Sequence, residues 1–264
     1  MTKTQKELAF LRELHVDSAW TERFTDFVDK NLKLSDAKNI LYINAGTGNH
    51  AIALREKLDK DSKIFAVSEN QDLLNIARDK AAAVKADVNF STRKFKDKTF
   101  DAVLVDASFS RPADLRNLLN EAARVAETGG KVALFTPTAG SFGEIFSFLW
   151  EIFFNDGLGN YGAEAESLIT GLPTVSRLEE IAENAGLKKI ETQTSNETFE
   201  YENGAEFINS TLVANFLLPV WLKFLNKKQK ERVHAELVQL VDAEDGDLSF
   251  RFSVKATLMT GEKG

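Results

Sequence analysis

The chain has 264 residues, of which 43% are hydrophobic and 28% are charged, and its formal net charge is -7. This composition is typical of a protein that folds around an apolar core, and it excludes a disordered chain. The acidic balance argues against a nucleic-acid partner, and the absence of cysteine excludes disulfides and thiolate metal sites, so we expect neither nucleic acid nor metal.

The first 38 residues predict helices rather than a leader peptide. Residues 1–14 mix Lys and Glu with apolar residues at helical spacing, whereas a signal peptide needs an unbroken apolar run. The most apolar stretch, residues 207–225, is interrupted by Pro219 and Lys223 and falls short of the roughly 20 apolar residues of a bilayer span. We therefore expect a cytoplasmic protein without a membrane span.

Strand and helix patterns alternate over residues 39–136. Apolar runs of strand formers alternate with segments of helical spacing, and these runs cover residues 40–43, 64–67, 88–90, 102–105 and 131–135. Strands that are apolar throughout and separated by helices belong to a parallel sheet covered on both faces. The alternation predicts an α/β fold with a doubly wound, mostly parallel sheet.

Two helical insertions interrupt this alternation in the second half of the chain. The first, residues 137–175, contains a phenylalanine-rich helix at 141–154, and the second covers residues 203–245. Three interpretations stay open for their aromatic residues: they line an acceptor pocket or lid, they pack against one another, or they form a face for a homodimer or a protein partner.

Two further strands are predicted around these insertions. Ser176 and Glu179 have the spacing of a capping box and predict a helix that Gly186 ends, followed by a strand at residues 188–194. Residues 248–258 alternate apolar and polar side chains with a period of two, which predicts the last strand. The expected sheet therefore has seven strands.

A glycine loop follows the first strand. Gly46, Gly48 and Ala51 give the pattern G-x-G-x-x-A, and Glu69 lies near the end of the second strand. In the dinucleotide fingerprint such glycines let the backbone approach a phosphate, and the later acid binds a ribose. The same pattern also fits a tight turn kept for folding. By itself it leaves a nucleotide-like cofactor and a purely structural turn open.

The residues around this loop carry a family resemblance. Residues 44–54, Asn-Ala-Gly-Thr-Gly-Asn-His-Ala-Ile-Ala-Leu, resemble motif I of class I S-adenosylmethionine-dependent methyltransferases, in particular small-molecule, type 11-like members. Similar pieces follow in the family's order at residues 66–78, 100–105 and 127–131, and the similarity covers about residues 20–260. The resemblance implies a seven-stranded Rossmann-like sheet with S-adenosylmethionine as cofactor.

The implied organisation is a single methyltransferase-like domain over residues 1–264. Its parts are N-terminal helices (1–38), a cofactor-binding half (39–136) and the two insertions as a lid or substrate region. The implied activity is methyl transfer to a small, apolar or amphipathic acceptor molecule. Because the sulfonium carries its own leaving group and the protein mainly positions the reactants, no catalytic residue is implied.

The resemblance also implies a set of cofactor-binding residues at the carboxyl ends of the strands. These are Asn44, Ala45, Gly46, Gly48, Ser68, Glu69, Asn70, Thr92 and Asp106. The glycines leave room for the methionyl part of the cofactor, and Ser68 or Glu69 accepts hydrogen bonds from the ribose. Asp106 has two interpretations: it orients the acceptor or serves as a base, or it caps the turn that follows.

Three positions depart from the family pattern. Asn44 replaces an acid, Ser68 stands in register with the ribose-binding acid, and residues 91–94 lack the acid expected near the adenine. If each lost contact costs on the order of 1 to 1.5 kcal/mol, affinity falls about a hundredfold or more. The alternative hypothesis is therefore a degenerate methyltransferase-like protein without cofactor that acts as a structural or protein-binding subunit.

A third hypothesis, an NAD-dependent reductase, shares only the glycine loop, because neither Tyr161 nor Tyr201 is followed four residues later by Lys. His50, in the first turn of the helix after the loop, is expected to form a local hydrogen bond rather than to face the crevice.

Overall fold

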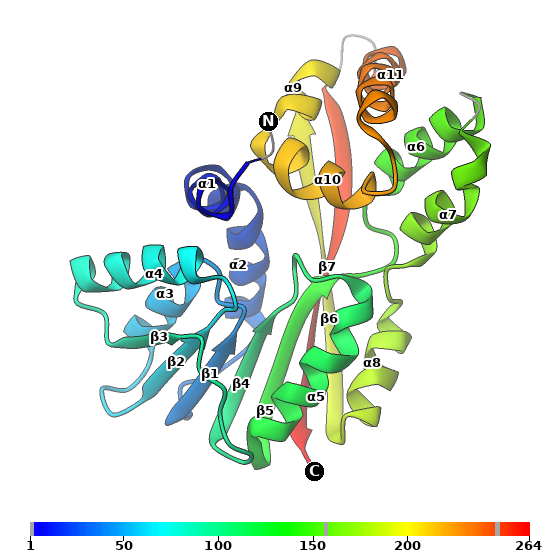
Figure 1. Cartoon of the computed structure of the whole chain (residues 1–264). Helices are drawn as coiled ribbons and strands as arrows, with labels where there is room; N and C mark the ends of the chain where they lie inside the picture. Colours follow the sequence, from blue (N-terminus) through cyan, green and yellow to red (C-terminus); the bar gives the residue numbers. More distant parts are fainter. Residues whose placement is uncertain (1–2, 156–157, 246–248) are drawn as a thin grey trace. The chain divides into compact units, whose positions relative to one another are not determined.

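The computed structural model describes residues 3–155, 158–245 and 249–264. The chain folds into two compact units (Figure 1). Unit 1 consists of Met1–Thr136, Thr174–Ser195 and Ala256–Gly264, and unit 2 consists of Pro137–Pro173 and Asn196–Lys255. Unit 2 thus takes in nearly all of both predicted insertions. The grouping of residues 1–264 as a single domain stays a prediction.

Seven strands form one sheet in the order β3-β2-β1-β4-β5-β7-β6. Strands β1 to β5 are parallel, and β7 runs against its two neighbours (Figure 1). The strands are β1 (Asn39–Ile43), β2 (Lys63–Val67), β3 (Val88–Ser91), β4 (Phe100–Asp106), β5 (Ala126–Pro137), β6 (Leu187–Tyr201) and β7 (Phe250–Lys263). The predicted α/β fold with a doubly wound, mostly parallel seven-stranded sheet is confirmed. The predicted start of the last strand at Leu248 lies outside the described residues.

Helices cover both faces of the sheet in unit 1. They are α1 (Gln5–Leu11), the π-helix η1 (Arg12–Thr21), α2 (Glu22–Asn31), α3 (Asn49–Lys57), α4 (Gln71–Val84), the 3-10 turn η2 (Pro112–Asp114), α5 (Leu115–Val125) and α8 (Val175–Asn184). Leu41 and Ile43 of β1 join the apolar core beneath α5 and α8. Tyr42, between them, points to the other face and contacts His50 of α3. Because successive side chains of a strand point to opposite faces, β1 contributes to the packing on both faces of the sheet.

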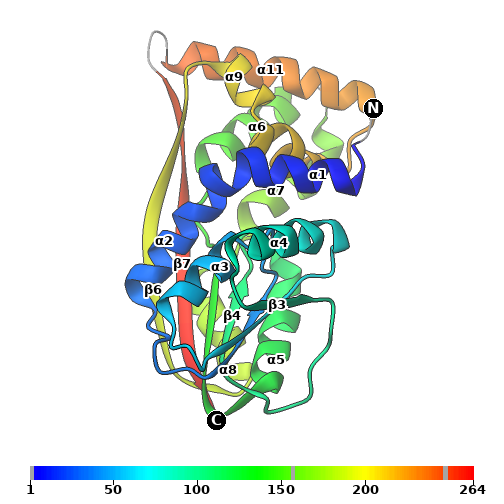
Figure 2. The ribbon, with the colours of Figure 1, turned by 90° about the vertical axis from the view of Figure 1, so that its left-hand side faces the viewer.

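The N-terminal helices are fastened to the rest of unit 1. Helix α1 lies beside α4 (Figure 2). Gln5 Oε1 accepts a hydrogen bond from Asn70 Nδ2 at 3.3 Å, and Glu13 forms an ion pair with Lys80 at 2.5 Å. Phe24 of α2 contacts Phe135 of β5, with 6.1 Å between ring centroids. These contacts bring η1 to the loop that follows β1.

Aromatic packing dominates the core of unit 2. Its elements are α6 (Gly143–Asn155), η3 (Gly159–Tyr161), α7 (Gly162–Thr170), α9 (Gly204–Asn209), the π-helical turn η4 (Val213–Leu217), α10 (Leu218–Trp221) and α11 (Lys227–Asp245), with the adjoining ends of β6 and β7. Trp221 lies 5.0 Å from the rings of both Phe142 and Phe146, and Phe207 lies 5.0 Å from Phe250. The aromatic residues of the two insertions therefore pack largely against one another.

Two large apolar side chains of α6 remain outside this core. Trp150 is 45% exposed and Phe154 is 79% exposed. The predicted homodimer or partner face on the insertions stays a prediction. Across the described residues, no helix combines the length and the apolar character that a membrane crossing requires.

The capping box predicted for Ser176 and Glu179 was wrong. Helix α8 begins two residues earlier than that box requires, with Thr174 as its N-cap, and Thr174 Oγ1 accepts a hydrogen bond from the Arg177 N–H at 3.1 Å. Glu179 instead accepts a hydrogen bond from the Thr192 hydroxyl at 2.7 Å. The extended backbone of Thr174 makes it the cap, although no Glu or Gln follows at the third position.

We expect Thr174→Ala to lower the free energy of unfolding by about 1 kcal/mol, because an orphan N–H of the first turn loses its acceptor. Ser176→Ala, two residues later on the same helix, should change it by less than about 0.5 kcal/mol. Urea unfolding followed by circular dichroism measures both. A larger loss for Ser176→Ala would contradict the assignment of the cap.

Candidate functional site

The turn after β1 adopts left-handed backbone conformations. The angle φ is 59° at Asn44, 57° at Gly46 and 84° at Gly48. Glycine adopts these angles without steric cost, and asparagine tolerates them better than most residues. The Asn44 side chain donates a hydrogen bond from Nδ2 to the Asp106 carbonyl at 3.2 Å. The turn after β1 is thereby tied to the end of β4.

The two loop glycines face different surroundings. A Cβ at Gly46 would lie 2.9 Å from Arg12 Nη2, at the edge of a cavity. A Cβ at Gly48 would lie 2.8 Å from Ala77 Cβ and 2.8 Å from Phe90 Cζ. Gly48 therefore allows close packing of the loop on α4 and β3, whereas Gly46 borders the cavity.

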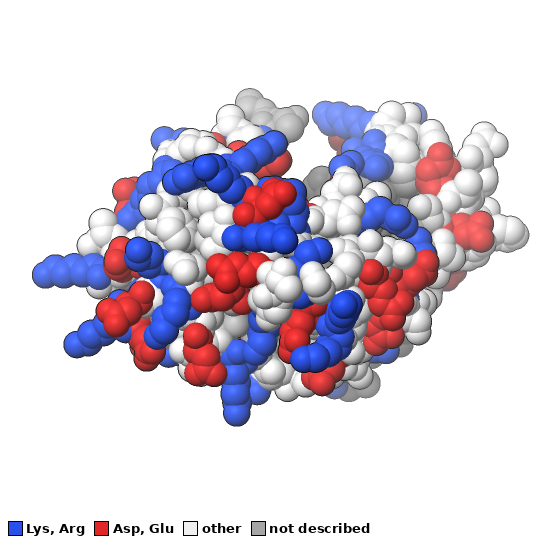
Figure 3. Space-filling model, turned by 90° about the horizontal axis from the view of Figure 1, so that it is seen from below, with Lys and Arg blue, Asp and Glu red and all other residues white. Residues whose placement is uncertain are grey.

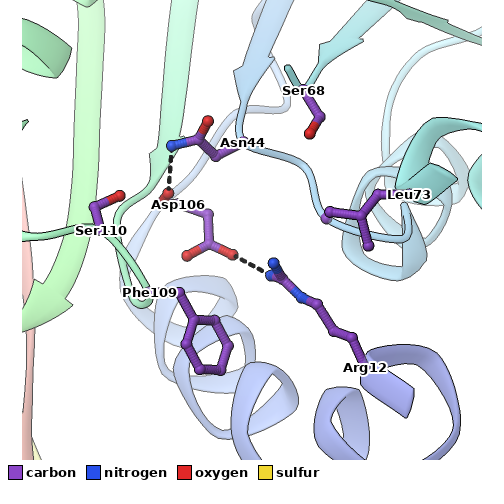
Figure 4. A pocket seen from close by; sticks show the side chains of 8 residues that line it. Arg12, Asn44, Ser68, Leu73, Asp106, Phe109 and Ser110 are labelled. Carbon is purple, nitrogen blue, oxygen red and sulfur yellow. Dashed lines mark hydrogen bonds and ion pairs between the residues drawn. The ribbon is translucent and has the colours of Figure 1, made fainter. Parts of the chain in front are cut away.

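The cavity has a volume of about 190 Å³ and lies at the carboxyl ends of β1, β2 and β4 (Figure 4). It is lined by Arg12, Asn44, Gly46, Ser68, Leu73, Asp106, Phe109 and Ser110. In open α/β sheets, ligands bind in the crevice outside the carboxyl ends of the strands. Its place in the fold makes this cavity the candidate cofactor site.

The structure brings only some of the predicted site residues together there. Asn44, Gly46, Ser68 and Asp106 line the cavity, and Gly48 does not. Ala45 is buried, and its N–H donates to the Val67 carbonyl at 3.1 Å.

The remaining predicted residues lie outside the cavity lining. Glu69 and Thr92 are exposed. Asn70 is the N-cap of α4, where Oδ1 accepts hydrogen bonds from the N–H groups of Asp72 at 2.9 Å and Leu73 at 3.2 Å. At the end of β2, Ser68 rather than Glu69 is therefore the residue that faces the cavity.

Sequence reasoning missed four lining residues. Phe109 and Ser110 lie in the loop that begins after Asp106, so the carboxyl end of β4 is a signal that points to them. Leu73 sits in the first turn of α4, after Asn70. Arg12 enters from η1, far away in the sequence, and its position depends on how the N-terminal helices pack, for which the local pattern holds no signal.

Arg12 is the cation in the cavity lining, and its side chain is 13% exposed. Its Nη2 lies 3.7 Å from Asp106 Oδ2 and its Nε lies 3.7 Å from Asp17 Oδ1. The guanidinium also lies over the Phe109 ring, 4.9 Å from the centroid. These contacts place a positive charge between two acids and an aromatic face.

Asp17 joins η1 to the glycine loop. Its side chain is 5% exposed and accepts hydrogen bonds from the Thr47 hydroxyl, from Asn49 Nδ2 at 2.9 Å and from the Thr21 hydroxyl at 3.0 Å. A buried carboxylate is tolerated when donors and a cation surround it. Asp17 therefore fixes both the loop and the segment that carries Arg12.

Asp106 caps the turn that follows β4 and also lines the cavity, while its predicted role as a base or acceptor-orienting residue stays a prediction. Its Oδ1 accepts a hydrogen bond from the Ser108 N–H at 2.8 Å, which caps the turn, while the same carboxyl group lines the cavity. Burial raises the pKa of Asp106 above its ordinary value, and the Arg12 guanidinium opposes this rise. A buried carboxyl group of this kind is a candidate for proton transfer.

His50 takes part in a separate network. Its Nδ1 is 2.9 Å from the Tyr42 hydroxyl and its Nε2 is 3.1 Å from Asp29 Oδ1. His50 does not line the cavity. These bonds link α3 to β1 and α2 and give His50 a structural role.

Charges of both signs share the surface. On the face shown in Figure 3, Lys and Arg are interspersed with Asp and Glu. Exposed pairs such as Lys38 with Asp59, at 2.8 Å, neutralise one another locally. In the part of the chain that the structure describes, no group of three or more His, Asp or Glu side chains is arranged to hold a metal ion.

The fold is that of a class I S-adenosylmethionine-dependent methyltransferase, so the sequence prediction of fold and cofactor is confirmed. The chain belongs to the ubiE/COQ5 methyltransferase family, whose model matches residues 13–199.

Relatives of known name support this membership. A demethylmenaquinone methyltransferase from Thermus thermophilus is 32% identical over 160 residues, which cover 56% of this chain and 70% of that protein. A demethylmenaquinone methyltransferase from Bacillus cereus is 25% identical over 183 residues, which cover 62% of this chain and 77% of that protein. A match with the Shouchella clausii protein of the same name covers only 56% of that protein.

Solved structures share the fold. The YcgJ protein from Bacillus subtilis superposes with a TM-score of 0.59 at 16% identity, covering 92% of this chain and 98% of that chain. A putative methyltransferase from Bacillus halodurans gives 0.57 at 17% identity, with coverages of 92% and 97%. At these identities the likeness concerns the fold alone.

Proposed function

We propose that this chain transfers a methyl group from S-adenosylmethionine to a small, amphipathic acceptor with a quinone-like ring. The observation that carries the proposal is the cavity at the ends of β1, β2 and β4, beside the glycine loop. The named relatives from Thermus thermophilus and Bacillus cereus support a ring acceptor, because both are demethylmenaquinone methyltransferases.

The residues of the cavity suit a nucleoside that carries an amino acid. The left-handed Gly46 exposes the backbone, the Ser68 hydroxyl at the end of β2 can bond a ribose hydroxyl, and Arg12 supplies a cation. When bound, the cofactor supplies an activated methyl group on a sulfonium together with its own leaving group. The protein's part is to orient the two reactants and to exclude water.

Asp106 is the residue that we propose for handling the proton. When a ring C–H becomes C–CH3, the new C–C bond forms as the C–S bond breaks, and the ring carbon loses its proton. The raised pKa of Asp106 moves this carboxylate toward the range in which it accepts a proton efficiently. Its place in the cavity lining supports this role.

Two measurements test the proposed function. Calorimetric titration should give saturable binding of S-adenosylmethionine and of S-adenosylhomocysteine. Incubation with a reduced naphthoquinone that has an unsubstituted ring carbon should give a product heavier by one methylene unit in mass spectrometry. An absence of heat and of thermal shift at millimolar ligand would contradict the proposal.

That negative result would favour the second candidate, a methyltransferase-like subunit without cofactor. Two observations support this candidate: Arg12 lies against Gly46, and Glu69 at the end of β2 is exposed.

The ribose contact can be assigned by two substitutions at the end of β2. Ser68→Asp is expected to tighten S-adenosylhomocysteine binding about tenfold, because a carboxylate accepts charge-assisted hydrogen bonds from the ribose hydroxyls. The matched control Glu69→Gln, one residue away and exposed, should leave the dissociation constant within about twofold. If Glu69→Gln weakens S-adenosylhomocysteine binding and Ser68→Asp has no effect, Glu69 rather than Ser68 contacts the ribose.

A further inference from the structure

Arg12 has hydrogen-bonding capacity that its protein partners do not use. Its side chain is only 13% exposed, and the two acids beside it, Asp17 and Asp106, stand 3.7 Å away, beyond hydrogen-bond distance. Its Nε is buried and has no hydrogen-bond acceptor among the described residues. Because buried donors are almost always paired, this arrangement indicates a missing acceptor.

The guanidinium is directed at the cavity. Arg12 Nη2 lies 2.9 Å from the position that a Gly46 Cβ would take, and Arg12 is part of the cavity lining (Figure 4). The Phe109 ring supports its planar face at 4.9 Å. The group is therefore held in place with donors left over for a ligand.

The neighbouring acids do not compete strongly with an incoming anion. The Asp17 carboxylate already accepts hydrogen bonds from Thr21, Thr47 and Asn49. The Asp106 carboxyl group accepts one from the Ser108 N–H through Oδ1, and its Oδ2 stays 3.7 Å from Arg12 Nη2. A ligand carboxylate that approaches Arg12 to ordinary hydrogen-bond distance would be its closest partner.

We infer that Arg12 binds the carboxylate of the cofactor's amino-acid part, an inference that rests on the proposed function. A guanidinium presents two parallel N–H donors that match a carboxylate. The N-terminal segment η1 thus supplies one wall of the cofactor site, and the glycine at position 46 leaves space for the arginine and the ligand together. The opposite role, in which Arg12 plugs the loop and excludes the cofactor, predicts a different response to substitution.

A pair of ligands that differ by one carboxylate separates these roles. Calorimetry with S-adenosylmethionine and with decarboxylated S-adenosylmethionine is carried out on the wild type, Arg12→Met and Arg12→Lys. Arg116→Met, which removes an exposed arginine from α5, is the matched control. Arg12→Met should weaken S-adenosylmethionine about 10- to 100-fold and leave the decarboxylated ligand within about threefold.

Arg12→Lys keeps the charge but loses the planar fork, so an intermediate loss is expected, and Arg116→Met should bind like the wild type. An unchanged ratio of the two affinities in Arg12→Met, or tighter binding of both ligands, overturns the inference and leaves the proposed function intact. If Arg12→Met does not fold, the test uses the wild type and Arg12→Lys. A wild type that binds S-adenosylmethionine and its decarboxylated form with nearly equal affinity overturns the inference. A wild type that binds neither ligand removes the proposed function as well.

Discussion

Replacing Gly48 by alanine is expected to lower the free energy of unfolding by about 3 kcal/mol, the sum of backbone strain and overpacking. At φ of 84° an alanine is strained, and its Cβ would lie 2.8 Å from both Ala77 Cβ and the Phe90 ring. Those two atoms belong to α4 and β3, so the loop cannot move away without disturbing both. Urea unfolding followed by circular dichroism gives the value.

Gly129→Ala is the matched control for this change. Gly129 has φ of 80°, close to that of Gly48, but no described atom lies within 4 Å of its added Cβ. It should therefore show the conformational cost alone, about 1 to 2 kcal/mol. Equal losses for the two variants would mean that close packing at Gly48 contributes nothing.

Replacing Asp17 by alanine is expected to lower the free energy of unfolding by about 3 kcal/mol or more, because it removes a shared hydrogen-bond acceptor and the partner of a nearby cation. Thr21, Thr47 and Asn49 lose their acceptor, and Arg12 loses a carboxylate that lies 3.7 Å from its Nε. The loss should appear as a lower urea midpoint. Cofactor binding should weaken too, since Asp17 holds the segment that carries Arg12.

Asp26→Ala removes an exposed carboxylate from the neighbouring helix α2 and should change the free energy of unfolding by less than about 0.5 kcal/mol. If Asp17→Ala were no more costly than Asp26→Ala, the fastening of η1 to the glycine loop would not depend on this carboxylate.

Much of the fold could be predicted because its signals are local. Apolar runs separated by helical spacing specify a parallel sheet, and parallel strands end at one edge, so Asn44, Ser68 and Asp106 meet at the cavity. The resemblance at residues 44–54 then identified the class of cofactor, which the family match confirmed.

The rest of the site depends on contacts between distant segments. Arg12 reaches the loop only because η1 packs beside it, through Asp17 and Thr47. The orientation at the end of β2 depends on a single residue of register, which turns Ser68 toward the cavity and leaves Glu69 in solvent. Sequence spacing resolves elements but not such one-residue differences.

Asn44, which replaces the acid of the family's motif I, has a structural role in this protein. Its backbone is left-handed with φ of 59°, and its side chain donates to the Asp106 carbonyl. An ionised acid at this position would have no proton to give and would add a second negative charge next to the Asp106 carboxylate. With asparagine in place of the acid, the side chain at position 44 becomes a donor that joins the end of β1 to the end of β4. This departure from the family motif is therefore compatible with an intact site.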